Sequence, residues 1–126
     1  MDVREFIEKD RFAADAGCRL TAWGDGEATV EVTVEERHLN AVGTAQGGLI
    51  FTLADTAFAA AANSGGQRTV SLSTTVSFLR PAAPGKLTAR AVTVSRTRST
   101  CCIDVLVTDE AGRAVAKLQC TGYSKD

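Results

Sequence analysis

The sequence lacks the residues that several classes of protein require. Its 126 residues include a single histidine, His38, and no Cys-x-x-Cys pair, so we expect neither a metal site nor a cysteine–histidine catalytic pair. Fourteen basic residues against fifteen acidic ones leave a formal charge of −1 with no block of one sign, which argues against nucleic-acid binding. We interpret the four cysteines as small buried hydrophobic residues in a reducing compartment.

Long apolar runs are missing as well. Thr52, Asp55 and Thr56 interrupt the stretch that comes nearest to the roughly 18 residues of a membrane span. Residues 1–17 are charged throughout and lack the basic start, apolar middle and small-residue cleavage site of a secretory signal. We therefore expect a soluble, cytoplasmic protein without a membrane segment, and the length predicts a single domain over residues 1–126.

Alternation of apolar and polar residues predicts most of the sheet. In residues 27–36, alanine and valine occupy every second position and share one face of a strand. Asp25-Gly26 is typical of a hairpin turn. Further strands are predicted at residues 18–23, 69–79, 86–96, 101–108 and 114–123, with a turn at 109–112. A short N-terminal helix is predicted over residues 3–14, ending near Gly17.

A longer helix is predicted from Gly47 to about Ala62, because this stretch is rich in alanine and leucine and does not alternate. The glycines of the following Asn-Ser-Gly-Gly sequence, residues 63–66, are expected to end it. Since nearly all its sides are apolar, it should lie buried against the sheet. One buried helix on an antiparallel sheet of about six strands is an α+β fold. The long edges of such a sheet favour a homodimer.

The candidate chemistry lies within this helix. Gly47 and Gly48 open it, where unpaired backbone N–H groups and the positive end of the helix dipole could bind an oxygen that gains negative charge, although a tight turn is the alternative. Asp55 follows Gly47 at about 12 Å along the axis, so the two could meet only across a two-fold dimer. Asp55 could act as a partly desolvated base or nucleophile, or belong to a solvated stripe with Thr52, Thr56 and Asn63.

The segment HLNAVGTAQGGLIFTLADTAFAAAANSGG, residues 38–66, together with FLRPA at 78–82, resembles the hotdog-fold acyl-CoA thioesterases of the phenylacetate-pathway type. The resemblance implies a curved antiparallel sheet wrapped around a long central helix. It also implies edge-to-edge dimers that pair into homotetramers. The implied reaction converts an aryl- or medium-chain acyl-CoA to a free acid and coenzyme A, without a metal or bound cofactor.

The resemblance also assigns roles to individual residues. The N–H group of Gly47 would bind the thioester oxygen, and Asp55 of the other subunit would attack the carbonyl or activate a water. Asn40 would place the thioester or the water, although its position also suits a residue that stabilises its own turn. Ser71 matches a position that holds the hydrolytic water in some relatives. Ser71, Ser73, Thr75 and Ser77 could equally form one solvated face of a strand.

Gln46 departs from the resemblance, because most such relatives have histidine before the two glycines. Glutamine can donate and accept hydrogen bonds but cannot carry a proton, so a non-catalytic acyl-CoA or acyl-carrier binding protein stays an alternative. Gln46 and Gly48 would contact the substrate. Arg96, Arg98 and Ser99 match positions that contact coenzyme A, or mark a solvated turn.

Two further expectations follow from residue type and position. His38 lies outside the matched catalytic positions and is expected in a loop or at the surface. Trp23 and Phe78 could line an acyl pocket or belong to the core.

Overall fold

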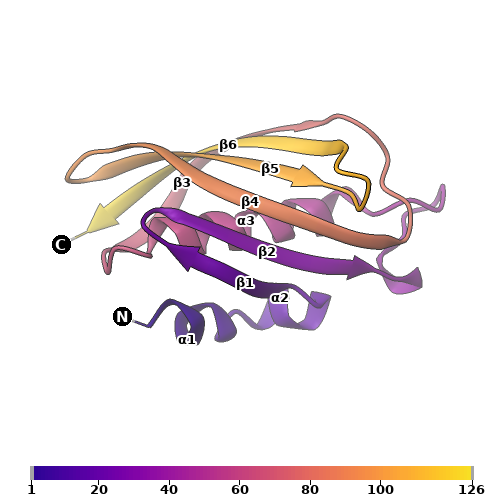
Figure 1. Cartoon of the computed structure of the whole chain (residues 1–126), viewed down its shortest axis with the longest axis horizontal. Coiled ribbons are helices and arrows are strands. Elements are labelled where there is room, and N and C mark those ends of the chain that lie inside the picture. The colour runs from indigo at the N-terminus through magenta and orange to yellow at the C-terminus, as the bar shows by residue number, and fades with distance from the viewer. Residues whose placement is uncertain (1, 126) are drawn as a thin grey trace.

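Six strands and one long helix dominate residues 2–125, the part of the chain that the computed structural model describes (Figure 1). In chain order the elements are α1 (Val3–Glu8), α2 (Arg11–Ala16), β1 (Arg19–Gly24), β2 (Glu27–Val34), the 3₁₀ helix η1 (Glu36–His38), α3 (Gly47–Ala62), β3 (Arg68–Phe78), β4 (Gly85–Arg96), β5 (Thr100–Thr108) and β6 (Ala114–Lys125). The predicted α+β layout, including the bounds of the central helix, is confirmed.

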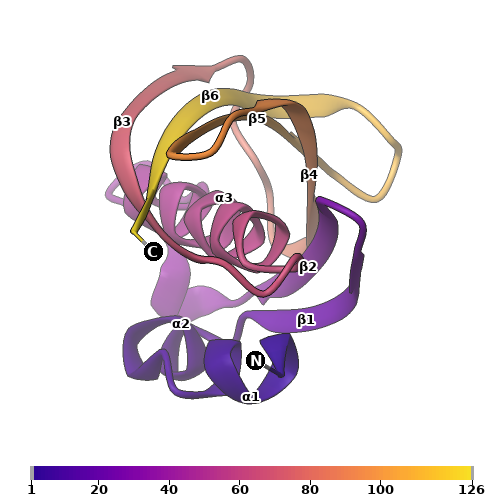
Figure 2. The same ribbon diagram turned by 90° about the vertical axis from the view of Figure 1, so that its left-hand side faces the viewer.

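The strands form one antiparallel sheet in the order β1-β2-β4-β5-β6-β3. Figure 2 shows the sheet curving over α3, with α1 and α2 under the helix on the side that the sheet leaves open. β1 and β3 are therefore the edge strands. Exposed apolar side chains accompany the β3 edge at Val70, Leu72 and Phe78.

The core lies between the concave face of the sheet and α3. Val30 and Val32 of β2 are at most 2% exposed, which confirms the alternating pattern, and the small Ala54, Ala57 and Ala60 let α3 approach the strands closely. Gly122 of β6 marks a close contact between the sheet and the helix. A Cβ added there would lie 2.9 Å from the Phe58 ring and equally close to Cys101 and Thr69.

The N-terminal prediction was wrong in one respect, because the predicted single helix is two short ones. Asp2 caps α1 by accepting a hydrogen bond from the Arg4 N–H, and Asp10 caps α2 by accepting one from the Ala13 N–H. An aspartate that caps a new helix favours a break before it, and this outweighs the continuous apolar spacing. Gly17 ends α2 with a φ of 94°, as its position predicted.

The end of α3 also differs from the prediction, since Asn63 rather than glycine ends the helix. Asn63 is fully buried; its Oδ1 accepts from the Thr69 N–H at 2.8 Å, and its Nδ2 donates to the Ala59 carbonyl at 2.7 Å. Arg96 donates to the Ala62 carbonyl. A side-chain amide and a guanidinium thus satisfy the last turn and connect α3 to β3 and β4. None of the helices in residues 2–125 has the length and apolar character needed to cross a bilayer.

Candidate active site

The central helix exposes one narrow stripe. Its residues that are not buried are Gly47, Gly48, Phe51, Thr52, Asp55 and Ala59. At 100° per residue these positions span about 140° of the helix circumference. Thr56 and Asn63 are at most 3% exposed, so the solvated polar stripe proposed as an alternative for Asp55 does not exist. Asp55 instead shares its stripe with the two glycines that open the helix.

The opening turn of α3 presents one unpaired donor. Gln46 is the N-cap, and its side-chain Oε1 accepts a hydrogen bond from the Gly48 N–H. Its carbonyl accepts from the Leu49 N–H at 2.9 Å. The Gly47 N–H has no hydrogen-bond partner among residues 2–125. An incoming oxygen could therefore bind there, at the positive end of the helix dipole.

Phe78 of β3 explains why residue 47 is small. A Cβ on Gly47 would lie 3.3 Å from the tip of the Phe78 ring. The ring is 55% exposed and covers one side of the opening turn. Phe78 therefore borders the site, whereas Trp23, the other candidate for an acyl pocket, lies on β1 beneath the Arg4 guanidinium at 4.7 Å.

Asp55 is half-buried, and its carboxyl group has no hydrogen bond to any other residue in the range 2–125. Burial raises its pKa above the ordinary aspartate value, and the negative charge of Asp10 raises it further. A carboxylate that is poorly hydrated and unpaired is a competent base. The distance of about 12 Å along the axis to Gly47 keeps the two groups apart within one chain.

Asn40 shapes the loop that leads into α3. Its Oδ1 accepts from the Val42 and Thr44 N–H groups at 3.1 and 3.0 Å, and its Nδ2 donates to the Thr44 hydroxyl at 3.0 Å. These contacts are those of the turn-stabilising alternative. The role of Asn40 toward the substrate stays a prediction. One Nδ2 hydrogen of Asn40 is left to donate to a substrate or a water.

Ser71 corrects the expectation of one polar face along β3. A bulge separates Ser71, which pairs with Gly122, from Ser73, which pairs with Thr121. Because Gly122 and Thr121 point to opposite faces of β6, the two serines do as well. Ser71 turns toward the face that carries α3 and approaches the Thr74 hydroxyl at 3.4 Å. The bulge is a tertiary feature that alternation alone could not predict.

The residues expected to contact coenzyme A lie at the other end of α3. Arg96 donates to Gln67 Oε1 at 2.6 Å and to the Ser124 hydroxyl at 3.1 Å, besides the Ala62 carbonyl. Arg98 and Ser99 are exposed in the β4–β5 turn, where the Ser99 carbonyl accepts from the Ser124 N–H. Arg96 contacts Ala62, which lies about 24 Å along the helix axis from Gln46 of the same chain.

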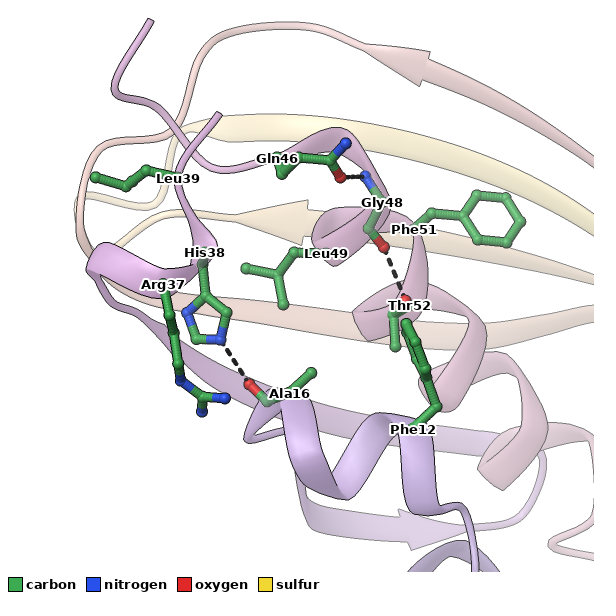
Figure 3. Close-up of a pocket in the computed structure, with 10 residues that line it drawn as sticks. All are labelled: Phe12, Ala16, Arg37, His38, Leu39, Gln46, Gly48, Leu49, Phe51 and Thr52. Carbon is green, nitrogen blue, oxygen red and sulfur yellow. Dashed lines mark hydrogen bonds between the residues drawn. The ribbon is translucent and has the colours of Figure 1, made fainter. Parts of the chain in front are cut away.

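A pocket of about 560 Å³ adjoins the opening turn (Figure 3). Ten residues from α2, η1 and the first half of α3 line it: Phe12, Ala16, Arg37, His38, Leu39, Gln46, Gly48, Leu49, Phe51 and Thr52. Phe12 and Ala16 lie far from α3 in the chain, so sequence pattern alone could not predict this pocket. The one signal in the sequence was Phe12 itself, an aromatic residue within the N-terminal segment predicted to be helical.

His38 is buried, contrary to its expected surface position. Its Nδ1 accepts from the Glu35 N–H at 2.9 Å, and its Nε2 donates to the Ala16 carbonyl at 2.8 Å (Figure 3). Accepting at one nitrogen and donating at the other requires the neutral ring. His38 therefore fastens α2 to η1 and forms part of the pocket wall.

The family model of the thioesterase superfamily matches residues 42–116, which include the opening turn and Asp55. The chain belongs to this superfamily. It is 36% identical to the acyl-coenzyme A thioesterase PaaI of Escherichia coli K12 over 116 residues, 91% of this chain and 83% of that protein. The solved E. coli PaaI structure matches with a TM-score of 0.94 at 32% identity, covering 97% of this chain and 89% of that one.

Two similar solved structures contain coenzyme A or acetyl-CoA. A hypothetical thioesterase of Streptococcus pneumoniae with coenzyme A has a TM-score of 0.89 at 29% identity, covering 96% of this chain and 95% of that one. A Streptococcus mutans protein bound to acetyl-CoA has a TM-score of 0.83 at 29% identity, covering 86% and 89% respectively. The expected hotdog fold, family and reaction class, thioester hydrolysis, are thereby confirmed.

Proposed function

We propose that the chain hydrolyses aryl- or medium-chain acyl-CoA thioesters at a site shared by two subunits. The observation that carries this proposal is the pair of unpaired groups on the exposed stripe of α3, the Gly47 N–H and the Asp55 carboxylate. They suit one reaction but lie about 12 Å apart along the axis, so a second subunit must complete the site. The coenzyme A and acetyl-CoA bound to the two streptococcal neighbours support acyl-CoA as the substrate class.

In this mechanism, the thioester carbonyl oxygen accepts a hydrogen bond from the Gly47 N–H of one subunit. Asp55 of the partner subunit takes a proton from water, and the water oxygen attacks the carbonyl carbon. The N–H stabilises the resulting oxyanion until the C–S bond breaks and coenzyme A leaves as the thiolate. Attack by the Asp55 carboxylate itself, through an anhydride that water then hydrolyses, is the second route.

Pairing of β3 edges would bring the two subunits together. β3 is the longer edge strand, and Val70, Leu72 and Phe78 leave more than half of their surface exposed along it. A second copy would cover these side chains and satisfy the free edge. We propose a dimer of this kind, and a homotetramer of two such dimers, in the cytoplasm.

The remaining candidate residues receive supporting roles in this proposal. Asn40 and Ser71 would hold the thioester or the water, Gln46 and Gly48 would border the carbonyl, and Arg96, Arg98 and Ser99 would contact coenzyme A. Gln46 also determines which N–H group is free in the opening turn. Its Oε1 accepts from the Gly48 N–H, which leaves the Gly47 N–H as the donor for the substrate. No bound cofactor is required.

Replacement of Gly47 by proline tests the oxyanion donor. Gly47 is the first helical residue, where proline is tolerated, and Gln46 before it has the extended φ of −64° and ψ of 136° that a following proline requires. Gly47→Pro removes the N–H while adding the carbons of the proline ring, and it should lower kcat by about 100- to 1,000-fold in an assay of thiol release. Gly47→Ala adds the same Cβ beside Phe78 but keeps the N–H, so it serves as the matched control.

Equal activity of the proline and alanine variants would contradict the mechanism. If the wild-type protein binds a non-hydrolysable acyl-CoA analogue tightly but releases no thiol from any acyl-CoA, the non-catalytic binding protein is the correct alternative.

A further inference from the structure

The pocket beside the opening turn is continuous with the proposed reaction site. Gln46 and Gly48 belong both to its lining and to the turn that presents the Gly47 N–H. A group attached to a carbonyl carbon at Gly47 therefore has the pocket directly beside it.

The pocket is suited to an uncharged group. Leu39, Leu49, Ala16 and Phe12 supply apolar surface, and the His38 ring and the Thr52 hydroxyl are already hydrogen-bonded. Both ring nitrogens of His38 are bonded, and the Thr52 hydroxyl donates to the Gly48 carbonyl at 2.8 Å.

Arg37, the charged member of the lining, is paired as well. Its Nη1 donates to the Asp15 carbonyl at 2.6 Å, and its Nε donates to Glu35 at 3.0 Å. A charged or strongly polar acyl group would lose much of its hydration against this largely apolar lining.

Phe12 is the exposed wall of the pocket. Its side chain is 75% exposed although the next residue of α2, Ala13, is buried. Figure 3 shows the ring reaching from α2 toward Thr52 across the pocket. An apolar group in the pocket would cover one face of the Phe12 ring, so that this face and the surface of the apolar group would both be removed from water.

We propose that this pocket, formed between α2 and α3 of a single chain, is the subsite for an uncharged apolar acyl group, with Phe12 and Ala16 setting its size. The inference rests on the proposed function for the position of the carbonyl. Each methylene that enters the pocket should strengthen binding by about fourfold, the effect of burying one such group. Binding should stop improving once the chain reaches the outer wall.

The experiment uses S-ethyl-, S-butyl- and S-hexyl-coenzyme A, thioethers that cannot be hydrolysed, with free coenzyme A as the reference. Their dissociation constants are measured by calorimetry for the full chain. Wild-type protein should bind each longer chain more tightly. Ala16→Leu fills the pocket and should flatten the series, whereas Ala14→Leu, the same change at an exposed position of α2 outside this pocket, should keep the wild-type slope.

Phe12→Ala gives a second test that does not depend on tolerance of the core, because Phe12 is largely exposed. It should weaken S-hexyl-coenzyme A by about four- to tenfold relative to free coenzyme A, the effect of losing part of an aromatic contact. A wild-type series without length dependence, or an unchanged slope in both Ala16→Leu and Phe12→Ala, would overturn the subsite.

Thiol release from the matching acyl-CoA esters separates this inference from the proposed function. If binding depends on acyl length, both variants reduce this dependence and no thiol is released, then the proposed hydrolase activity is wrong and the subsite proposal stands. If thiol is released but binding does not depend on acyl length, then the subsite proposal is wrong and the proposed hydrolase activity stands.

Discussion

At the scale of single residues, the role proposed for Asp55 rests on its missing partners. The carboxyl group lies on an apolar helix, half-buried and without a hydrogen bond to any residue in the range 2–125, and burial raises its pKa. A subunit packed against the exposed stripe would remove more water from it and act in the same direction. The same isolation that makes the charged form costly makes it a stronger base.

The pH dependence of hydrolysis should therefore reflect Asp55. The reaction needs the carboxylate, so kcat/KM should fall as the pH drops through the raised pKa, at a higher pH than an ordinary aspartate with a pKa of about 3.9 would give. Steady-state rates between pH 4 and 8 measure this acidic limb.

The control is His38→Gln, because His38 is the only histidine in the sequence. Glutamine can still donate to the Ala16 carbonyl, and the acidic limb should stay in place. A limb that disappears in this variant, or a profile that is level down to pH 4, would contradict the assignment to Asp55.

At the scale of the elements, the position of α3 depends on how closely the sheet can approach it. Gly122 lies where β6 passes the helix, and a side chain there would collide with atoms on three sides: the Phe58 ring, the Cys101 sulfur and a Thr69 methyl. The bulge beside Ser71 lies on the strand paired with this part of β6. Packing at this contact therefore helps to hold the α3 stripe and the inner face of β3 in place.

Gly122→Ala should lower the free energy of unfolding by about 1–3 kcal/mol, the usual cost of overpacking a core. Gly65→Ala is the matched control, since a Cβ at Gly65 would meet nothing within 4 Å. Urea unfolding of both variants measures the difference. Equal stability would mean that β6 and α3 can separate at little cost.

At the scale of the whole molecule, the proposal requires two chains to build one site. Gly47 and Asp55 belong to one rigid helix, and no rotation of side chains can close the distance of about 12 Å between them. The β3 edge offers the surface on which a second copy could pair. Activity and assembly should therefore be lost together.

Two inactive variants should restore activity when their subunits are mixed. In a mixed dimer of Gly47→Pro and Asp55→Ala, one site contains both changes and the other contains neither. Random mixing should give about a quarter of the wild-type rate, because half of the dimers are mixed and each has one intact site of two. Co-expression with two purification tags isolates the mixed dimers, which should give about half of the wild-type rate because one site of two is intact.

Each variant alone, treated identically, provides the background rate. Mixed dimers that are no more active than this background would mean that Gly47 and Asp55 do not act together across the subunit interface, and the shared-site proposal would fail.

Local pattern was sufficient for much of this protein. The alternation of Val30, Val32 and Val34 depends only on neighbouring residues, as does the alanine-rich run of α3, so the strands and the central helix were predicted closely. The predicted helix also placed Gly47 in the opening turn and Asp55 about two turns later. These positions identified both residues as candidates before any contact was known.

Only the tertiary structure decided which groups are unpaired and what surrounds them. The burial of Thr56 and His38, the reversal of Ser71 across the bulge and the pocket between Phe12 and α3 all depend on residues distant in the chain. The sequence by itself determined the elements and the candidate groups, because backbone preference and periodicity are local. The free or occupied state of each group depends on contacts that form only when the sheet closes over the helix.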